Sequence, residues 1–137
     1  MKTIIQISVL LFLIGSSVIS VQAQIISEEI VYQDSEVDSV PEYIGGKVAM
    51  MQHIHQAIID VDSRGCTGML MASFIVEIDG NVSNVKIIRP LCQKADEAVI
   101  NAVKTMPLWK PGIKNEEYVR VLINMPVRFL LPVKENE

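Results

Sequence analysis

The chain has 137 residues, of which 50% are hydrophobic and 20% are charged, and its formal net charge at pH 7 is −4. A chain of this length provides one modest domain. The acidic balance argues against a nucleic-acid-binding protein, because binding to nucleic acid requires a concentrated cationic face.

Residues 1–23 have the pattern of a secretory signal peptide. Lys2 gives a positive start, an apolar run follows, and Val21-Gln22-Ala23 supplies the small or apolar residues that signal peptidase reads. The apolar run is about 11 residues long, whereas a membrane-spanning helix needs roughly 20. We therefore expect cleavage before Gln24 and export; an uncleaved leader would instead anchor the chain in the inner membrane.

The mature part is expected to begin with residues 24–40, an acidic stretch without clear period that is typical of a flexible lead-in. The folded domain is then expected over residues 41–133, followed by a short tail at 134–137.

The first element of this domain is a predicted helix from about residue 46 to 59. Its apolar residues recur at helical spacing and are expected to face the core: Val48, Met51, Ile54 and Ile58.

Two β-rich runs follow and flank Asp79-Gly80, a dipeptide that suits a tight hairpin turn. A two-residue loop there would pair Phe74 with Val85 and Ala72 with Ile87. The hairpin then has one coherent apolar face, formed by Leu70, Ala72, Phe74, Val76, Ile78, Val85 and Ile87.

A second helix is predicted from its apolar stripe, which consists of Ala95, Ala98, Val99, Ala102, Val103 and Met106. Asp96 is expected as the N-cap, and Pro107 ends the helix. Strict alternation then predicts a third strand, with Val119, Val121, Ile123, Met125, Val127 and Phe129 on one face. The predicted fold is α+β, in the order α-β-β-α-β, with two helices packed on one face of a small three-stranded antiparallel sheet.

The segment "MPLWKPG" connects the second helix to the third strand and contains the only tryptophan. We expect Pro107, Trp109, Pro111 and Gly112 to form a structural corner in which Trp109 fills the end of the core. The alternative is an exposed aromatic residue that docks a partner.

Cys66 and Cys92 are expected to form a disulfide bond. Both lie at the open end of the hairpin, within about two positions of directly opposite each other, and an oxidising compartment favours pairing. Two free buried thiols are the alternative.

The sequence predicts no catalytic site, no metal site and no cofactor. His53 and His55 are two residues apart, which on a helix directs them to different sides and excludes the i, i+4 geometry of a helical metal pair. We expect both to be solvated or capping residues, and we predict that the protein is not an enzyme.

Four segments together resemble the C-terminal domain of TonB, in the form found in short energy-transducer homologues of Bacteroidota. They are "PEYIGG", "GMLMASFIVEIDGNVSNVKIIR", "ADEAVINAVKTMPLWKPG" and "VRVLINMPVRF", in this order over roughly 93 residues. The corner with its tryptophan is the most distinctive of them.

The resemblance implies a periplasmic binding module for TonB-dependent transmembrane transport. Such domains pair, through their last strand, with an extended segment (the TonB box) of an outer-membrane receptor, by the addition of one strand to a sheet edge. The implied partner-binding edge strand here consists of Tyr118, Val119, Arg120, Val121, Leu122, Ile123, Asn124 and Met125. The same edge would also allow a homodimer to form.

The sequence departs from the family in its N-terminal part. The expected cleavable leader and the short lead-in replace the membrane helix and the proline-rich spacer of a full TonB, so partners among the inner-membrane proton-channel proteins are not expected. Two functions follow: a periplasmic module that binds an outer-membrane transporter, or a structural adaptor of an envelope complex that keeps the fold without binding a TonB box.

Overall fold

The computed structural model describes residues 30–61 and 65–130. The predicted signal peptide at 1–23, the first part of the predicted lead-in and the tail at 134–137 lie outside the described residues. None of the described helices is both long enough and apolar enough to cross a membrane.

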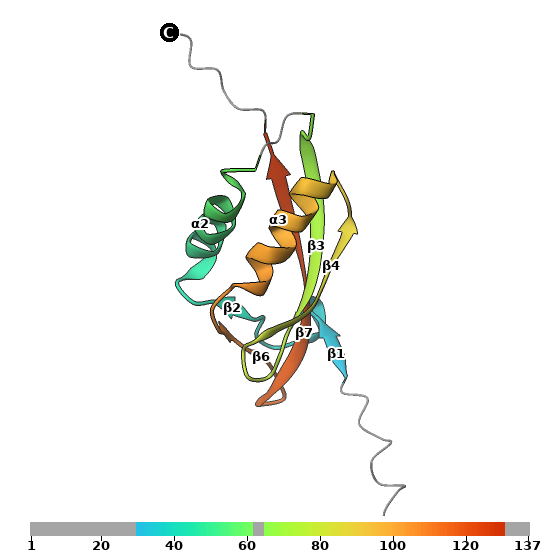
Figure 1. Cartoon of the computed structure of the whole chain (residues 1–137). Coiled ribbons are helices and arrows are strands. Elements are labelled where there is room, and N and C mark those ends of the chain that lie inside the picture. Colours follow the sequence, from blue (N-terminus) through green and yellow to red (C-terminus); the bar gives the residue numbers. More distant parts are fainter. Residues whose placement is uncertain (1–29, 62–64, 131–137) are drawn as a thin grey trace, which may run out of the picture.

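The main sheet has five strands, of which three match the predicted ones (Figure 1). These are β3 (Gly68–Val76), β4 (Val82–Arg89) and β7 (Glu117–Phe129), with β3 in the middle and antiparallel to both neighbours. Two short strands, β1 (Val31–Gln33) and β6 (Gly112–Lys114), both pair with β7.

The predicted three-stranded antiparallel sheet is therefore incomplete, because β1 runs parallel to β7 and makes the sheet mixed. Each added strand is only three residues long, too short for alternation to appear in the sequence. Part of the stretch expected to be a flexible lead-in is thus structured, with a 3₁₀ helix at Asp34–Glu36 after β1.

Two helices lie on one side of the main sheet, as Figure 1 shows. They are α2 (Gly46–Ile58) and α3 (Gln93–Lys104). The predicted stripe of α3 faces the core: Ala95, Val99, Ala102 and Val103 are buried, as is Met106 just beyond the helix. They pack in one cluster with Leu70, Phe74 and Val76 of β3.

The predicted apolar face of α2 is only partly correct. Ile54 is buried, but the side chains of Val48 and Met51 are 69% and 59% exposed. The helix packs mainly on α3 and on β2 (Glu42–Tyr43), a short strand outside the main sheet, and its contacts with the strands of the main sheet are few. Helical spacing alone could not show that this helix extends beyond the sheet that it was expected to cover.

The β3–β4 hairpin does not have the predicted two-residue loop. The Glu77 N–H donates to the Asn81 carbonyl (2.8 Å), which leaves residues 78–80 as a three-residue loop. A bulge at Asn84, whose φ is +50°, then restores the predicted pairing of Ala72 with Ile87. Asn tolerates this left-handed conformation better than most residues.

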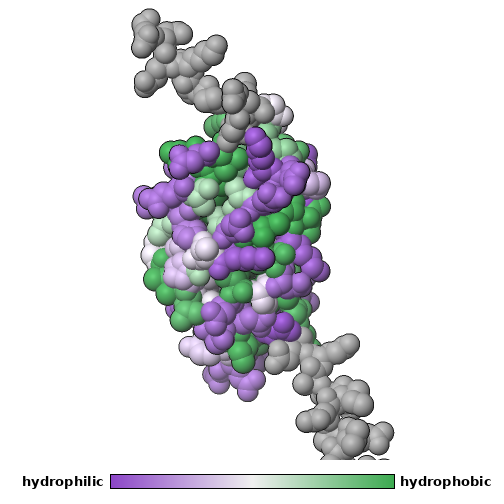
Figure 2. Space-filling model, viewed as in Figure 1, coloured by the Kyte–Doolittle hydropathy of each residue, from purple (hydrophilic) through white to green (hydrophobic). Residues whose placement is uncertain are grey.

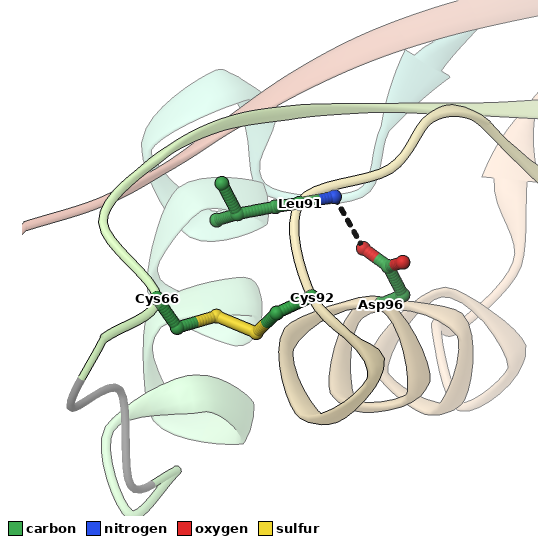
Figure 3. The surroundings of a disulfide bond; sticks show 4 residues. All are labelled: Cys66, Leu91, Cys92 and Asp96. Atoms are coloured by element: carbon green, nitrogen blue, oxygen red, sulfur yellow. Dashed lines mark hydrogen bonds between the residues drawn. A yellow bond between two sulfur atoms is a disulfide. The ribbon is translucent and has the colours of Figure 1, made fainter.

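The start of α3 is tied to the start of β3 by the predicted disulfide bond. Cys66 and Cys92 are bonded, with 6.0 Å between their Cα atoms (Figure 3). The N-cap residue is Cys92 and not the predicted Asp96. Asp96 lies within the first turn, where its Oδ1 accepts a hydrogen bond from the Leu91 N–H at 3.0 Å.

The corner segment closes the other end of the core. Trp109 is 6% exposed and packs edge-on against Phe74 and Tyr43, with ring centroids 5.6 and 5.4 Å away. It belongs to β5 (Trp109–Lys110), which pairs with β2. Pro107 is exposed, Pro111 is half-buried, and Gly112 is buried where β6 begins.

Candidate binding edge

The candidate site is the outer edge of β7, the edge that faces away from β3. Along the inner edge, β3 pairs without interruption with residues 121–129. Along the outer edge, β1 pairs with residues 120–122 only. Among the described residues, no strand covers the outer edge from Ile123 to Phe129.

The structure divides the predicted docking residues into three parts. Tyr118 and Val119 lie where β7 pairs with β6, residues 120–122 lie beside β1, and residues 123–125 have an uncovered outer edge. Along this stretch, Val121 and Met125 are buried on the helix side, whereas Tyr118 and Asn124 are exposed.

Pro126 indicates which N–H groups face outward. It pairs with Met71 inside the unbroken β3–β7 ladder, and a proline has no N–H to contribute to that ladder. Its nitrogen is therefore directed to the outer edge. Because alternate residues of a strand direct their N–H groups to the same edge, those of Leu122, Asn124 and Arg128 also point outward.

The strand β1 is held by few interactions. Its three residues pair with β7, and Lys114 lies over the Tyr32 ring, with Nζ 4.7 Å from the centroid. Within the turn that follows, the Gln33 N–H donates to Glu36 Oε2 at 2.6 Å. Val31 and Tyr32 are half-buried, and Ile30 before them is 66% exposed.

A groove lies between α2 and the uncovered part of β7. Its volume is about 260 Å³, and its lining comes from α2 (Met50, Met51, Ile54, His55, Ile58) and from β7 (Met125, Pro126, Val127, Arg128). Sequence reasoning missed the contribution of α2, because it assigned the apolar residues of this helix to the core. The signal that could have revealed it is a helix with apolar residues on more than one face.

Arg120 is fixed by an ion pair on the sheet. Its Nε and Nη2 donate to the two carboxylate oxygens of Glu77 at 2.6 and 3.0 Å, and Ser83 Oγ donates to the same carboxylate. The hydrogen bonds from Arg120, above all, lower the pKa of Glu77, and burial opposes this only in part. Arg120 is thus already paired within the domain.

His53 connects the two helices, since its Nε2 lies 2.8 Å from the carbonyl oxygen of Ala102. In the part of the chain that the structure describes, no three His, Cys, Asp or Glu side chains are grouped so that they could hold a metal ion.

Comparison with known proteins gives a family match. Residues 60–131 match the family model described as "Gram-negative bacterial TonB protein C-terminal". Two solution structures of the Helicobacter pylori TonB C-terminal domain are similar at 24% and 23% identity, with TM-scores of 0.38 and 0.39. The alignments cover 64% and 61% of this chain, and 85% and 95% of those chains. No curated protein gives a significant match.

Proposed function

Because the chain belongs to the family of Gram-negative bacterial TonB C-terminal domains, we propose that it is a periplasmic module that binds an extended segment of an outer-membrane transporter. Domains of this family are non-catalytic, are periplasmic in Gram-negative bacteria and interact with outer-membrane TonB-dependent receptors. The proposed role is in TonB-dependent transport or its regulation, after export by the predicted signal peptide.

The observation that carries this proposal is the uncovered outer edge of β7. A free edge presents N–H and C=O groups with which an extended peptide can pair as an additional strand. The proposed docking strand is Tyr118–Met125, of which Ile123–Met125 are not covered by β1. The outward N–H of Asn124 is the donor best placed for an incoming strand, since the next outward position is Pro126.

A titration of the exported chain with synthetic peptides tests the proposal. The peptides should cover the extended periplasmic segments of outer-membrane TonB-dependent receptors from the same organism, and calorimetry would give the dissociation constants. We expect Asn124→Pro to weaken binding at least about tenfold, since a strand-edge donor is lost and the ring obstructs pairing. Asn124→Ala removes the same side chain but keeps the N–H, and should bind within about twofold of the unmodified chain.

Circular dichroism and thermal unfolding should show that both Asn124 variants are folded. Equal affinities of the proline and alanine variants would place the binding site elsewhere. Failure of every receptor peptide to bind the unmodified chain would contradict the proposed function itself.

The second candidate function, a structural adaptor without TonB-box binding, is favoured by the position of β1. This strand occupies residues 120–122, the centre of the predicted docking stretch. An adaptor would bind none of the receptor peptides, and chemical cross-linking in the periplasm would instead connect it to other envelope proteins.

A further inference from the structure

We infer that the side of the main sheet opposite the helices docks on an anionic lipid surface, through the cations Lys86, Arg89 and Arg128 and the apolar side chains among them. The docking area lies where β3 begins and where β4 and β7 end. It is separate from the outer edge of β7 and includes β4, the strand at the other edge of the sheet. This inference goes beyond the proposed peptide binding and does not depend on it.

The register of the strands brings the three cations together on one face. Each of them pairs with a residue in the first half of β3: Arg128 with Met69, Arg89 with Met71, and Lys86 with Ser73. Leu70 and Ala72, which alternate with these β3 residues, are fully buried in the core. Because successive side chains of a strand point to opposite faces, the three pairs point away from the helices. These six residues are called the basic face below.

A bulge in β4 adds an aliphatic side chain beside the basic face. Met71 pairs with Arg89 but its neighbour Ala72 pairs with Ile87, so Ile88 is the extra residue of β4. Ile87 packs against the core, and alternation directs the next side chain to the opposite side of the sheet. In agreement with this direction, Ile88 is 57% exposed.

The charge of the basic face is opposite to that of the chain. Its three cations are all exposed, and none of its six residues is acidic. The β7 residues opposite Met71 and Ser73 are Pro126 and Asn124, which are also uncharged. Glu77, just past the end of β3, is already bonded to Arg120. In a chain of net charge −4, a cationic face without carboxylates is complementary to an anionic partner.

Apolar groups accompany the cations, as a lipid surface requires. Met69 and Met71 are half-buried, and Leu130, just past β7, is 69% exposed. A cavity of about 290 Å³ lies at this end of the sheet. Its lining residues are Thr67, Gly68, Met69, Arg128, Phe129 and Leu130. A lipid phosphate and the adjoining apolar part of the lipid would therefore find a guanidinium and apolar side chains next to each other.

The shape of the basic face favours a lipid surface over a protein segment. In Figure 1, α3 lies in front of the sheet, so Figure 2 shows the helix side, where hydrophilic and hydrophobic residues are mixed. On the other side of the sheet, the cations are spread over β4 and β7, two strands about 10 Å apart. Such an array can meet several lipid headgroups at once, and anionic headgroups attract each Lys or Arg held close to the membrane surface. The expected export of the chain would place it between two membranes.

Flotation of the exported chain with lipid vesicles tests this inference. One kind of vesicle consists of phosphatidylcholine, and the other also contains the anionic lipid phosphatidylglycerol. We expect the partition coefficient to be at least about tenfold higher with phosphatidylglycerol and to fall in high salt. Lys86→Glu and Arg89→Glu should each lower it about fivefold or more. Lys47→Glu and Lys104→Glu make the same charge change on α2 and α3 and should leave it within about twofold.

A second matched pair of variants tests the apolar contribution. Ile88→Gln should lower the partition coefficient about threefold or more, since an aliphatic side chain is lost from the lipid contact. Val48→Gln changes an exposed aliphatic residue on α2 and should leave it within about twofold. Circular dichroism should show that all variants are folded. The three β4 variants should bind receptor peptides as the unmodified chain does, because β4 is the edge strand away from β7.

Equal partition into the two kinds of vesicle would overturn the inference. Equal losses in the β4 and helix variants would also overturn it, because the attraction would then depend on net charge alone. Binding of inorganic phosphate or of a glutamate-rich peptide without binding to vesicles would show that the basic face recognises a soluble anion, which contradicts a lipid surface. None of these measurements needs a receptor peptide, so a failure of the proposed function would be distinguishable from a failure of this inference.

Discussion

The N–H of Trp109 donates a hydrogen bond of 2.8 Å to the carbonyl oxygen of Gly80. This contact joins the corner after α3 to the turn of the β3–β4 hairpin. It requires the two backbones to approach closely: a Cβ placed on Gly80 would lie 2.2 Å from the carbonyl oxygen of Trp109. The tryptophan therefore not only fills the core but also fixes the turn against the end of the sheet.

Substitution Gly80→Ala should destabilise the domain strongly, for two reasons. Gly80 has a φ of +86°, which disfavours any L side chain, and the new methyl group would meet backbone atoms that cannot move independently. We expect a loss of about 3 kcal/mol in the free energy of unfolding, measured by urea denaturation.

Gly46→Ala is the matched control for the conformational cost. Gly46 also has a positive φ, +81°, but a Cβ there has no neighbour within 4 Å. Its substitution should cost only about 1 kcal/mol. Similar losses of stability for the two variants would mean that the close approach of Gly80 to Trp109 adds nothing to the cost of placing alanine at a positive φ.

Much of the core could be predicted from the sequence, because its pattern is periodic. The alternation of residues 119–129 and the stripe of Ala95, Val99, Ala102 and Val103 both place their side chains correctly. Periodicity fails where an element is too short for its repeat to be recognised, as for the three-residue strands β1 and β6, or where a bulge such as that at Asn84 adds a residue to one strand.

The candidate site was harder to predict than the core. The sequence indicates that β7 is an edge strand, and Pro126 supports this, but no local pattern shows that β1 returns to cover residues 120–122. The groove depends on the position of α2 relative to the sheet, which is set by its packing on α3 and β2. Such long-range packing is not encoded in the spacing of apolar residues along one helix.

The pairing of β1 should open more readily than the rest of the sheet. Only three residues pair, and two of them are half-buried, whereas β3 is paired on both sides and largely buried. We expect the amide of Tyr32 to exchange with solvent deuterium at least about tenfold faster than that of Phe74, because local opening requires less free energy than global unfolding. Equal exchange rates for the two amides would show that β1 opens only when the whole domain unfolds.

The disulfide bond should account for a large share of the stability. It joins residues 26 positions apart, which in the chain-entropy model corresponds to about 3.5 kcal/mol. The double variant Cys66→Ser, Cys92→Ser should lose about 3 kcal/mol in urea denaturation, and reductant should lower the stability of the unmodified chain to a similar value. Alkylation of both cysteines in periplasmic protein prepared without reductant would contradict the bond.

The ion pair of Glu77 with Arg120 should make stability dependent on pH in the acid range. The folded state lowers the pKa of Glu77 below its ordinary value of 4.5. The stabilisation is therefore fully present above the unfolded pKa and is lost as the pH falls through the lower folded pKa.

We expect Glu77→Gln to destabilise the domain by about 1 kcal/mol at pH 7, since each side chain of the pair is 21% exposed and water weakens the interaction. The difference from the unmodified chain should shrink as the pH falls below about 4.5, where the carboxylate is protonated first in the unfolded chain and, at lower pH, in the folded chain as well. Urea denaturation at a series of pH values from 7 to about 2.5 would measure this difference in the free energy of unfolding.

A difference that stays constant over this range would show that the loss of stability comes from packing and not from the ionised carboxylate. The variant Glu117→Gln is the control, since Glu117 is exposed, and it should show no comparable change.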